Sequence, residues 1–159
     1  MKTIAKSFDM SPRRSHASIV TFSDSTASLV ASLDSFSSTS DFQKAVTSIR
    51  YGRGRGDLSK ALKLAEEKVF QTARKEFAKI AVVVIDGKEG KDGPWRDSVL
   101  SLKKAGVRVV LVVVGSEVDR AFLRTLVQDD VDVIIIDSFI DLLKKSVGIA
   151  KNTCDAAGK

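Results

Sequence analysis

The chain has 159 residues, 43% of them hydrophobic and 29% charged, so it is long enough for one domain with a full core. Its 26 basic and 20 acidic residues give a net charge of +6 and are mostly interleaved, which indicates a solvated surface, although this balance also suits anionic partners. The only cysteine, Cys154, excludes an internal disulfide and a zinc site built from several cysteines, and no apolar run is long enough to span a bilayer.

The first half of the chain predicts a strand hairpin followed by two helices. The expected elements are the end of a helix at 3–8, a loop at 10–14, strands at 17–22 and 26–33, and helices at 41–49 and 58–73. The polar stretch 37–40 has the composition of a helix cap, and Asp57 is a plausible N-cap for the second helix.

The second half alternates apolar strands with amphipathic helices. We expect strands at 79–85, 107–114 and 131–136, and helices at 95–105, 119–127 and 139–150. Strands that are apolar on both faces are typical of buried parallel sheets. The fold class predicted is therefore α/β, a doubly wound and mostly parallel sheet covered by helices on both faces, with 26–33 as an antiparallel edge strand.

The strand at 79–85 ends abruptly at Asp86 and Gly87. Open α/β sheets bind their ligands at the carboxyl ends of their strands. Asp86 is therefore expected at the ligand-bearing edge of the sheet.

Several segments, in this order and spacing, resemble a von Willebrand factor type A domain of the adhesion and extracellular-matrix kind. They are the second strand and its turn at 15–24, the loop and third helix at 49–62, the Asp-Gly turn at 83–88, and the helix–strand unit at 104–115. The resemblance runs to about Ile149, and we expect a domain at 1–151 and a tail at 152–159. It implies the Rossmann-like fold predicted above and a divalent cation at the top of the sheet.

The cation site that the resemblance implies is degenerate in this sequence. The family's ligands are an Asp-x-Ser-x-Ser loop after the first strand, a threonine before the third helix, and the Asp of the Asp-Gly turn. The first strand and its loop are missing here, and Gly56 occupies the threonine position, which leaves only Asp86. A single carboxylate is a poor magnesium site. We therefore expect no cofactor, with Mg²⁺ bound weakly at most unless the upstream loop is restored.

The missing strand also predicts a structural problem. Residues 17–22 and 79–85 must pair directly, or an edge of the sheet stays open and prone to aggregation. A truncated piece of a longer chain explains this simply. The resemblance implies that Cys154 pairs with a cysteine outside the chain, the alternative being an inert thiol.

The loop before the third helix holds the remaining candidates for partner binding, which are Arg53, Arg55, Gly56 and Asp57, together with Gly87 of the Asp-Gly turn. Arg55-Gly56-Asp57 is either an integrin-recognition tripeptide or a chance sequence in which Asp57 caps a helix. The glycines of this loop do not have the spacing of a phosphate loop, although its arginines could attract a sulfated glycan.

The function predicted is a non-enzymatic protein–protein interaction module of adhesion or matrix type. His16 has no nucleophile at a readable spacing and is expected to be structural. The partner would be a matrix protein or a cell-surface receptor, with a sulfated glycan as a further possibility and no nucleic acid. The resemblance implies an extracellular location, while the segment 1–10 does not read as a signal peptide. The alternatives are a small nucleotide- or anion-binding α/β protein and an inactive structural fragment.

Overall fold

The computed structural model describes residues 9–11, 13–23, 25–50, 52, 56–86, 93–115, 119–137 and 148. The helices predicted at 3–8 and 139–150 lie outside these residues, apart from Gly148. The chain forms two compact units, residues 1–74 and residues 75–159, and each is taken by itself below. Within the described residues, no helix is both long and apolar enough to cross a membrane.

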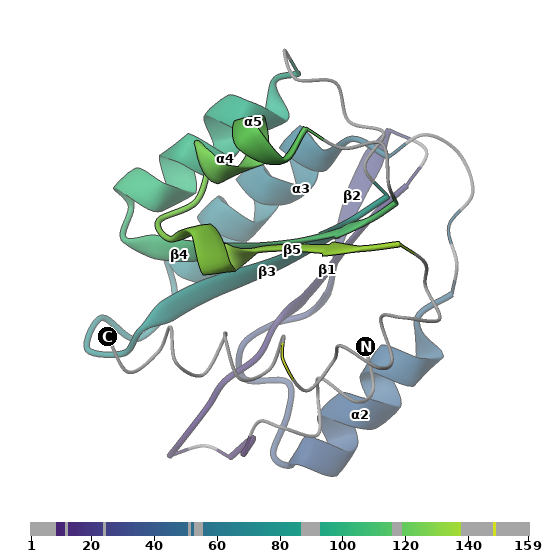
Figure 1. Cartoon of the computed structure of the whole chain (residues 1–159). Helices are drawn as coiled ribbons and strands as arrows, with labels where there is room; N and C mark the ends of the chain where they lie inside the picture. The colour runs from purple at the N-terminus through teal and green to yellow at the C-terminus, as the bar shows by residue number, and fades with distance from the viewer. Residues whose placement is uncertain are drawn as a thin grey trace. The chain divides into compact units, whose positions relative to one another are not determined.

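The first unit is built on a strand hairpin (Figure 1). Strands β1 (Ile19–Ser23) and β2 (Thr26–Ala31) pair antiparallel, and Ser25 in the turn between them has a positive φ of 60°. Helix α2 (Thr39–Ser48) follows, and then helix α3 (Leu58–Ala65) continues into the π-helical turn η1 (Glu66–Phe70).

Helix α3 packs on both strands of the hairpin through its apolar stripe. Leu58, Ala61 and Leu62 are all more than 90% buried, and Val69 of η1 continues the stripe. The spacing of these residues places them on one helical face, which explains why the segment folds as a helix against the sheet.

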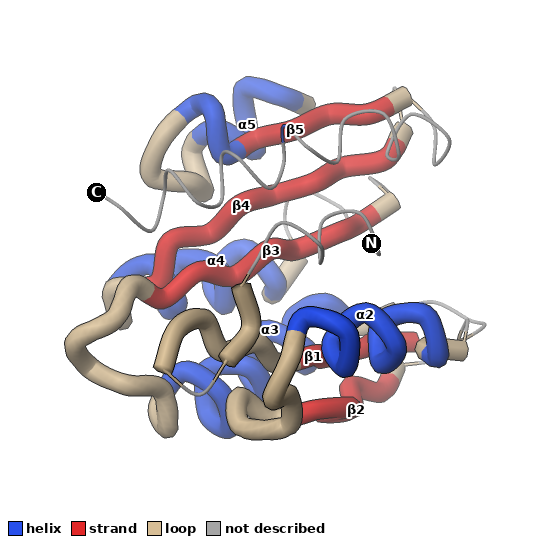
Figure 2. The backbone as a smooth tube through the Cα atoms, turned by 90° about the horizontal axis from the view of Figure 1, so that it is seen from below, coloured by secondary structure: helices blue, strands red, loops and turns tan. Residues whose placement is uncertain are grey.

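The second unit is a three-stranded parallel sheet (Figure 2). Its strands are β3 (Lys79–Ile85), β4 (Val107–Val114) and β5 (Val133–Ile136), in the order β3–β4–β5. Each strand is preceded or followed by helical segments, which are α4 (Trp95–Lys104), α5 (Arg120–Arg124) and the 3-10 turn η2 (Asp130–Asp132). This alternation of parallel strands and helices confirms the α/β class.

The core of this unit is centred on β4. All its residues except Arg108 are buried, because β4 is the middle strand and carries β-branched or leucine side chains on both faces. Leu102 of α4 and Leu126 after α5 are also almost fully buried. Trp95 of α4 meets Phe122 of α5 edge to face, with ring centroids 5.9 Å apart, so the two helices pack against each other.

Two elements end or begin differently from the sequence prediction. The α-helix expected to run to residue 73 ends at Ala65 and widens into the π-helical turn. The last described strand begins at Val133 rather than at 131, because Asp129 caps a 3-10 turn with its side chain on the backbone N–H of Val131. Among the described strands, β1 pairs with β2 and β3 pairs with β4.

Candidate functional site

The carboxyl ends of the three parallel strands lie together in the second unit. Asp86 follows β3, Gly115 follows β4 and Asp137 follows β5, and the two aspartates are exposed. Asp86 thus has the position at the sheet edge that the sequence predicted. Asp137 was not singled out from the sequence, although it too is a carboxylate directly after an apolar strand.

Gly115 brings these strand ends close to one another. Its backbone N–H donates to the carbonyl of Ile136 over 2.7 Å, and its φ of +136° lies in a region that side chains disfavour. A Cβ atom added here would come within 3.3 Å of the carbonyl oxygen of Asp86. A glycine is therefore needed where the chain leaves β4.

In the first unit, two glycines of the loop before α3 lie against the β1–β2 hairpin. A Cβ atom on Gly52 would lie 2.2 Å from the hydroxyl of Ser23, and one on Gly56 would lie 2.6 Å from the ring of Phe22. Side chains at either position would have to displace the end of β1. The glycines therefore have a packing role, whatever the loop binds.

Asp57 caps helix α3. Its carboxylate accepts a hydrogen bond from the backbone N–H of Lys60 over 3.1 Å and lies 3.6 Å from the ammonium of the same residue. That ammonium donates to the carbonyl of Ser25 in the hairpin turn over 2.8 Å. The loop, the helix and the hairpin are thereby joined through one lysine, and the carboxylate of the Arg-Gly-Asp tripeptide is engaged within the chain.

Position 56, where the sequence resemblance places a threonine ligand, is a glycine. Glycine supplies no side-chain oxygen, and the neighbouring space is filled by the Phe22 ring. Among the described residues, no group of three or more His, Cys, Asp or Glu side chains is placed to hold a metal. Of the other predicted site residues, Arg53, Arg55, Gly87 and Cys154 lie outside the described residues.

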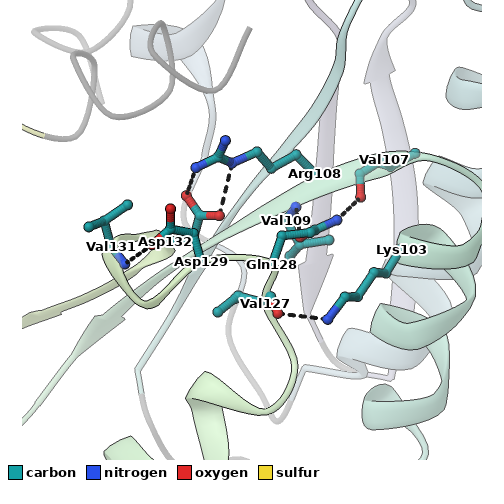
Figure 3. A network of polar contacts seen from close by, with 9 residues as sticks. All are labelled: Lys103, Val107, Arg108, Val109, Val127, Gln128, Asp129, Val131 and Asp132. Atoms are coloured by element: carbon teal, nitrogen blue, oxygen red, sulfur yellow. Dashed lines mark hydrogen bonds and ion pairs between the residues drawn. The ribbon is translucent and has the colours of Figure 1, made fainter. Parts of the chain in front are cut away.

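The opposite, amino-terminal edge of the parallel sheet carries a polar network that the sequence did not reveal (Figure 3). Arg108 of β4 forms two hydrogen bonds with the carboxylate of Asp132, at 2.9 and 3.0 Å, and Asp132 is fully buried. The pair is 24 residues apart in the sequence, so no local pattern could have predicted it.

Gln128 completes this network by forming the backbone hydrogen bonds that a neighbouring strand would otherwise form. β5 pairs with β4 only from Leu111 onward, so the first residues of β4 lack a strand partner on that side. The side-chain amide of Gln128 accepts from the N–H of Val109 over 3.3 Å and donates to the carbonyl of Val107 over 2.9 Å. The backbone groups that would otherwise be left unpaired are satisfied by one side chain.

Comparison with known proteins identifies the family. The model of the von Willebrand factor type A domain matches residues 1–146, and the chain therefore belongs to this family. The collagen alpha-1(XXI) chain of Homo sapiens is 32% identical over 123 residues, covering 77% of this chain and 12% of that protein. Cuticlin-6 of Caenorhabditis elegans is 30% identical over 139 residues, covering 87% of this chain and 24% of that protein. The chain thus spans a quarter or less of the length of these relatives.

Solved structures agree with this assignment. Proximal thread matrix protein 1 from the mussel byssus superposes with a TM-score of 0.84 at 25% identity, covering 97% of this chain and 39% of that one. A second structure of that protein, with a TM-score of 0.83, has zinc in its MIDAS motif. The manganese-loaded TRAP protein of Plasmodium vivax, at 17% identity and a TM-score of 0.70, shares the fold.

Proposed function

We propose that this chain is a non-enzymatic protein–protein interaction module of adhesion or extracellular-matrix type, acting outside the cell. The observation that carries the proposal is its membership of the von Willebrand factor type A family, together with relatives named as a collagen and a cuticlin over most of its length. The partner proposed is a matrix protein or a cell-surface receptor.

We also propose that binding does not depend on a tightly held metal ion. Position 56 offers no oxygen ligand, and Asp86 is the one member of the family's ligand set that the sequence retains. A partner would then be held by surface loops and charge, with Arg53 and Arg55 beside Gly56 and with Gly87 next to Asp86 as contact groups. Cys154 would pair with a cysteine outside this chain.

Magnesium tests the metal part of the proposal directly. A ligand that binds only the folded state raises the melting temperature in a saturable way. We expect no saturable rise when magnesium chloride is titrated up to millimolar concentrations, with potassium chloride of equal ionic strength as the control. A rise that Asp86→Asn abolishes would show a functional metal site and contradict the proposal.

Binding to immobilised matrix tests the interaction part. The purified chain is applied to fibrillar collagen and to a cell-surface adhesion assay, with and without EDTA. We expect saturable binding in at least one assay, unchanged by EDTA. Absence of binding in both, combined with a melting temperature raised by nucleotides, would favour the small nucleotide-binding protein instead.

Asp57→Asn separates the two interpretations of the Arg-Gly-Asp tripeptide. Asparagine caps helices about as well as aspartate, so we expect the free energy of unfolding to change by less than about 0.5 kcal/mol. Because the Asp57 carboxylate is already engaged with Lys60, we expect cell adhesion to be unchanged as well. A selective loss of adhesion with stability retained would assign the tripeptide to integrin-type recognition.

A further inference from the structure

Two segments of the first unit that are far apart in the sequence meet at one place, the turn of the β1–β2 hairpin and the loop before α3. The ammonium of Lys60 donates a hydrogen bond to the backbone carbonyl of Ser25 over 2.8 Å, across 35 residues of sequence. Gly52 and Gly56 also lie against the end of β1, because a Cβ atom at either position would clash with side chains of that strand. The turn and the loop therefore form one continuous surface, which we call the turn–loop surface and which comprises Ser23, Ser25, Thr26, Gly52 and Gly56.

The ammonium of Lys60 holds the turn–loop surface together. It lies 3.6 Å from the carboxylate of Asp57 in the loop and is hydrogen-bonded to Ser25 in the turn. The turn is closed by a second bond, from the hydroxyl of Thr26 to the carbonyl of Ser23 over 2.8 Å. The helix cap is separate from these contacts, because Asp57 accepts its 3.1 Å hydrogen bond from the backbone N–H of Lys60. Loss of the ammonium would thus loosen the turn from the loop and leave the cap of α3 in place.

The turn–loop surface is open to solvent, and the segments that form it carry a net positive charge. Ser25, Thr26, Gly52 and Gly56 are exposed, and the side chain of Lys60 is 58% exposed. Segments 23–26 and 50–60 together contain four basic and two acidic residues, a balance that attracts an acidic partner. Because the two glycines have no side chains, the backbone of a partner can approach the chain closely there.

We propose that the turn–loop surface binds an acidic segment of another polypeptide, and that Lys60 is its positioning residue. The inference rests on the proposed function, because it names the chemistry of the protein partner. Acidic side chains suit the net charge of these segments, and a polypeptide backbone suits the two exposed glycines. By fixing the turn against the loop before binding, Lys60 reduces the conformational entropy that is lost when the complex forms. Lys60 therefore acts through the shape of the surface as well as through its charge.

Poly-L-glutamate is the probe, and two lysines of α3 provide matched variants. Lys60→Met and Lys63→Met each remove one exposed ammonium from the same helix. Only the first removes the contact with Ser25. Binding to immobilised poly-L-glutamate is measured in buffer with EDTA, so that no metal ion contributes. Hydrogen exchange of the backbone amides is measured on the free chain, without any probe.

We expect Lys60→Met to bind poly-L-glutamate about ten-fold more weakly, because the loss of preorganisation adds to the loss of one charge. Lys63→Met should stay within about two-fold of the unmodified chain. In Lys60→Met alone, amide exchange should accelerate together at Thr26 in the turn and at Gly56 in the loop. This second measurement separates positioning from charge, since Lys63→Met removes the same charge.

Four results would overturn the proposal. Unchanged exchange at Thr26 and Gly56 in Lys60→Met would exclude the positioning role. Equal weakening in both variants would mean that net charge alone attracts the probe. Binding of heparin that depends on Lys60, with no binding of poly-L-glutamate, would assign the surface to a sulfated glycan. Binding of neither probe by the unmodified chain would exclude an acidic partner, while the collagen and cell-adhesion assays would still decide the proposed function separately.

Discussion

The two edges of the parallel sheet in the second unit use polar residues in opposite ways. At the amino-terminal edge, Asp132 is fully buried and takes both hydrogen bonds of a bidentate pair with Arg108, and Gln128 binds the backbone of β4 (Figure 3). At the carboxyl-terminal edge, Asp86 and Asp137 are exposed. The side chains of Arg108, Gln128 and Asp132 hold the strands in place, whereas the carboxylates of Asp86 and Asp137 lie at the surface.

This difference follows from the topology. β5 is four residues shorter than β4, and it pairs with the carboxyl-terminal half of β4. The amino-terminal half of β4 therefore needs side chains to satisfy its backbone and to cover its edge. At the other edge the strands end nearly level, and the chain can leave the sheet without such support.

The largest expected effect comes from removing the buried carboxylate. Asp132→Ala removes the buried carboxylate that pairs with Arg108, whose side chain is 16% exposed. Loss of one member of a buried ion pair costs about 3 kcal/mol or more. Urea unfolding should show this loss, while Asp137→Ala at the opposite edge should change the free energy of unfolding by less than about 0.5 kcal/mol. Equal losses in the two variants would remove the contrast between the edges.

A smaller loss is expected from Gln128→Ala, because two backbone groups of β4 lose their partner. Each unsatisfied group costs about 1 kcal/mol when water can partly replace the amide, so the total should be about 2 kcal/mol. Gln71→Ala is the matched control, because Gln71 is exposed. Hydrogen exchange should accelerate at the Val109 N–H in the Gln128 variant alone. Unchanged exchange there would contradict the strand-replacing role of Gln128.

The carboxyl-terminal edge depends on backbone conformation, and Gly115→Ala tests this. We expect a loss of about 1–2 kcal/mol, because the φ of +136° disfavours alanine and the added Cβ would lie 3.3 Å from the carbonyl of Asp86. Gly106→Ala is a useful comparison. Its φ is +78° but its Cβ would meet nothing within 4 Å, so its loss should be about 1 kcal/mol. A smaller loss at Gly115 than at Gly106 would mean that the strand ends can separate freely.

The sequence predicted those parts of the molecule that rest on local patterns. The apolar runs of β3 and β4 identified both strands, and Asp86 lies directly after β3 at the carboxyl edge of the sheet, as expected. The Arg108–Asp132 pair could not be predicted, because it depends on the register of β4 against β5. The π-helical end of α3 was missed for a different reason. The apolar stripe continues through it to Val69, so the sequence pattern there is the same as in the α-helix.

Whether a carboxylate stabilises the fold does not depend on its exposure alone. Asp41 at the start of α2 is an example. Its pKa is held below the usual value, chiefly by a hydrogen bond from the hydroxyl of Ser38 and next by one from Ser37. A carboxyl with a lowered pKa stabilises the folded state above its unfolded pKa, and this contribution is lost as the pH falls through the folded pKa. The contribution should therefore disappear only under acidic conditions, below pH 4.

Ser38→Ala and Ser37→Ala test this order of causes. An NMR titration of the Asp41 carboxyl should show its pKa rising in both variants, and rising further in Ser38→Ala because the Ser38 bond is the shorter one, at 2.7 Å against 3.2 Å. Ser35→Ala is the control, because Ser35 bonds to Ser32 rather than to Asp41. If neither substitution moves the titration, Asp41 behaves as a free surface carboxylate. Exposure alone would then distinguish the carboxylates that stabilise the fold from those that do not.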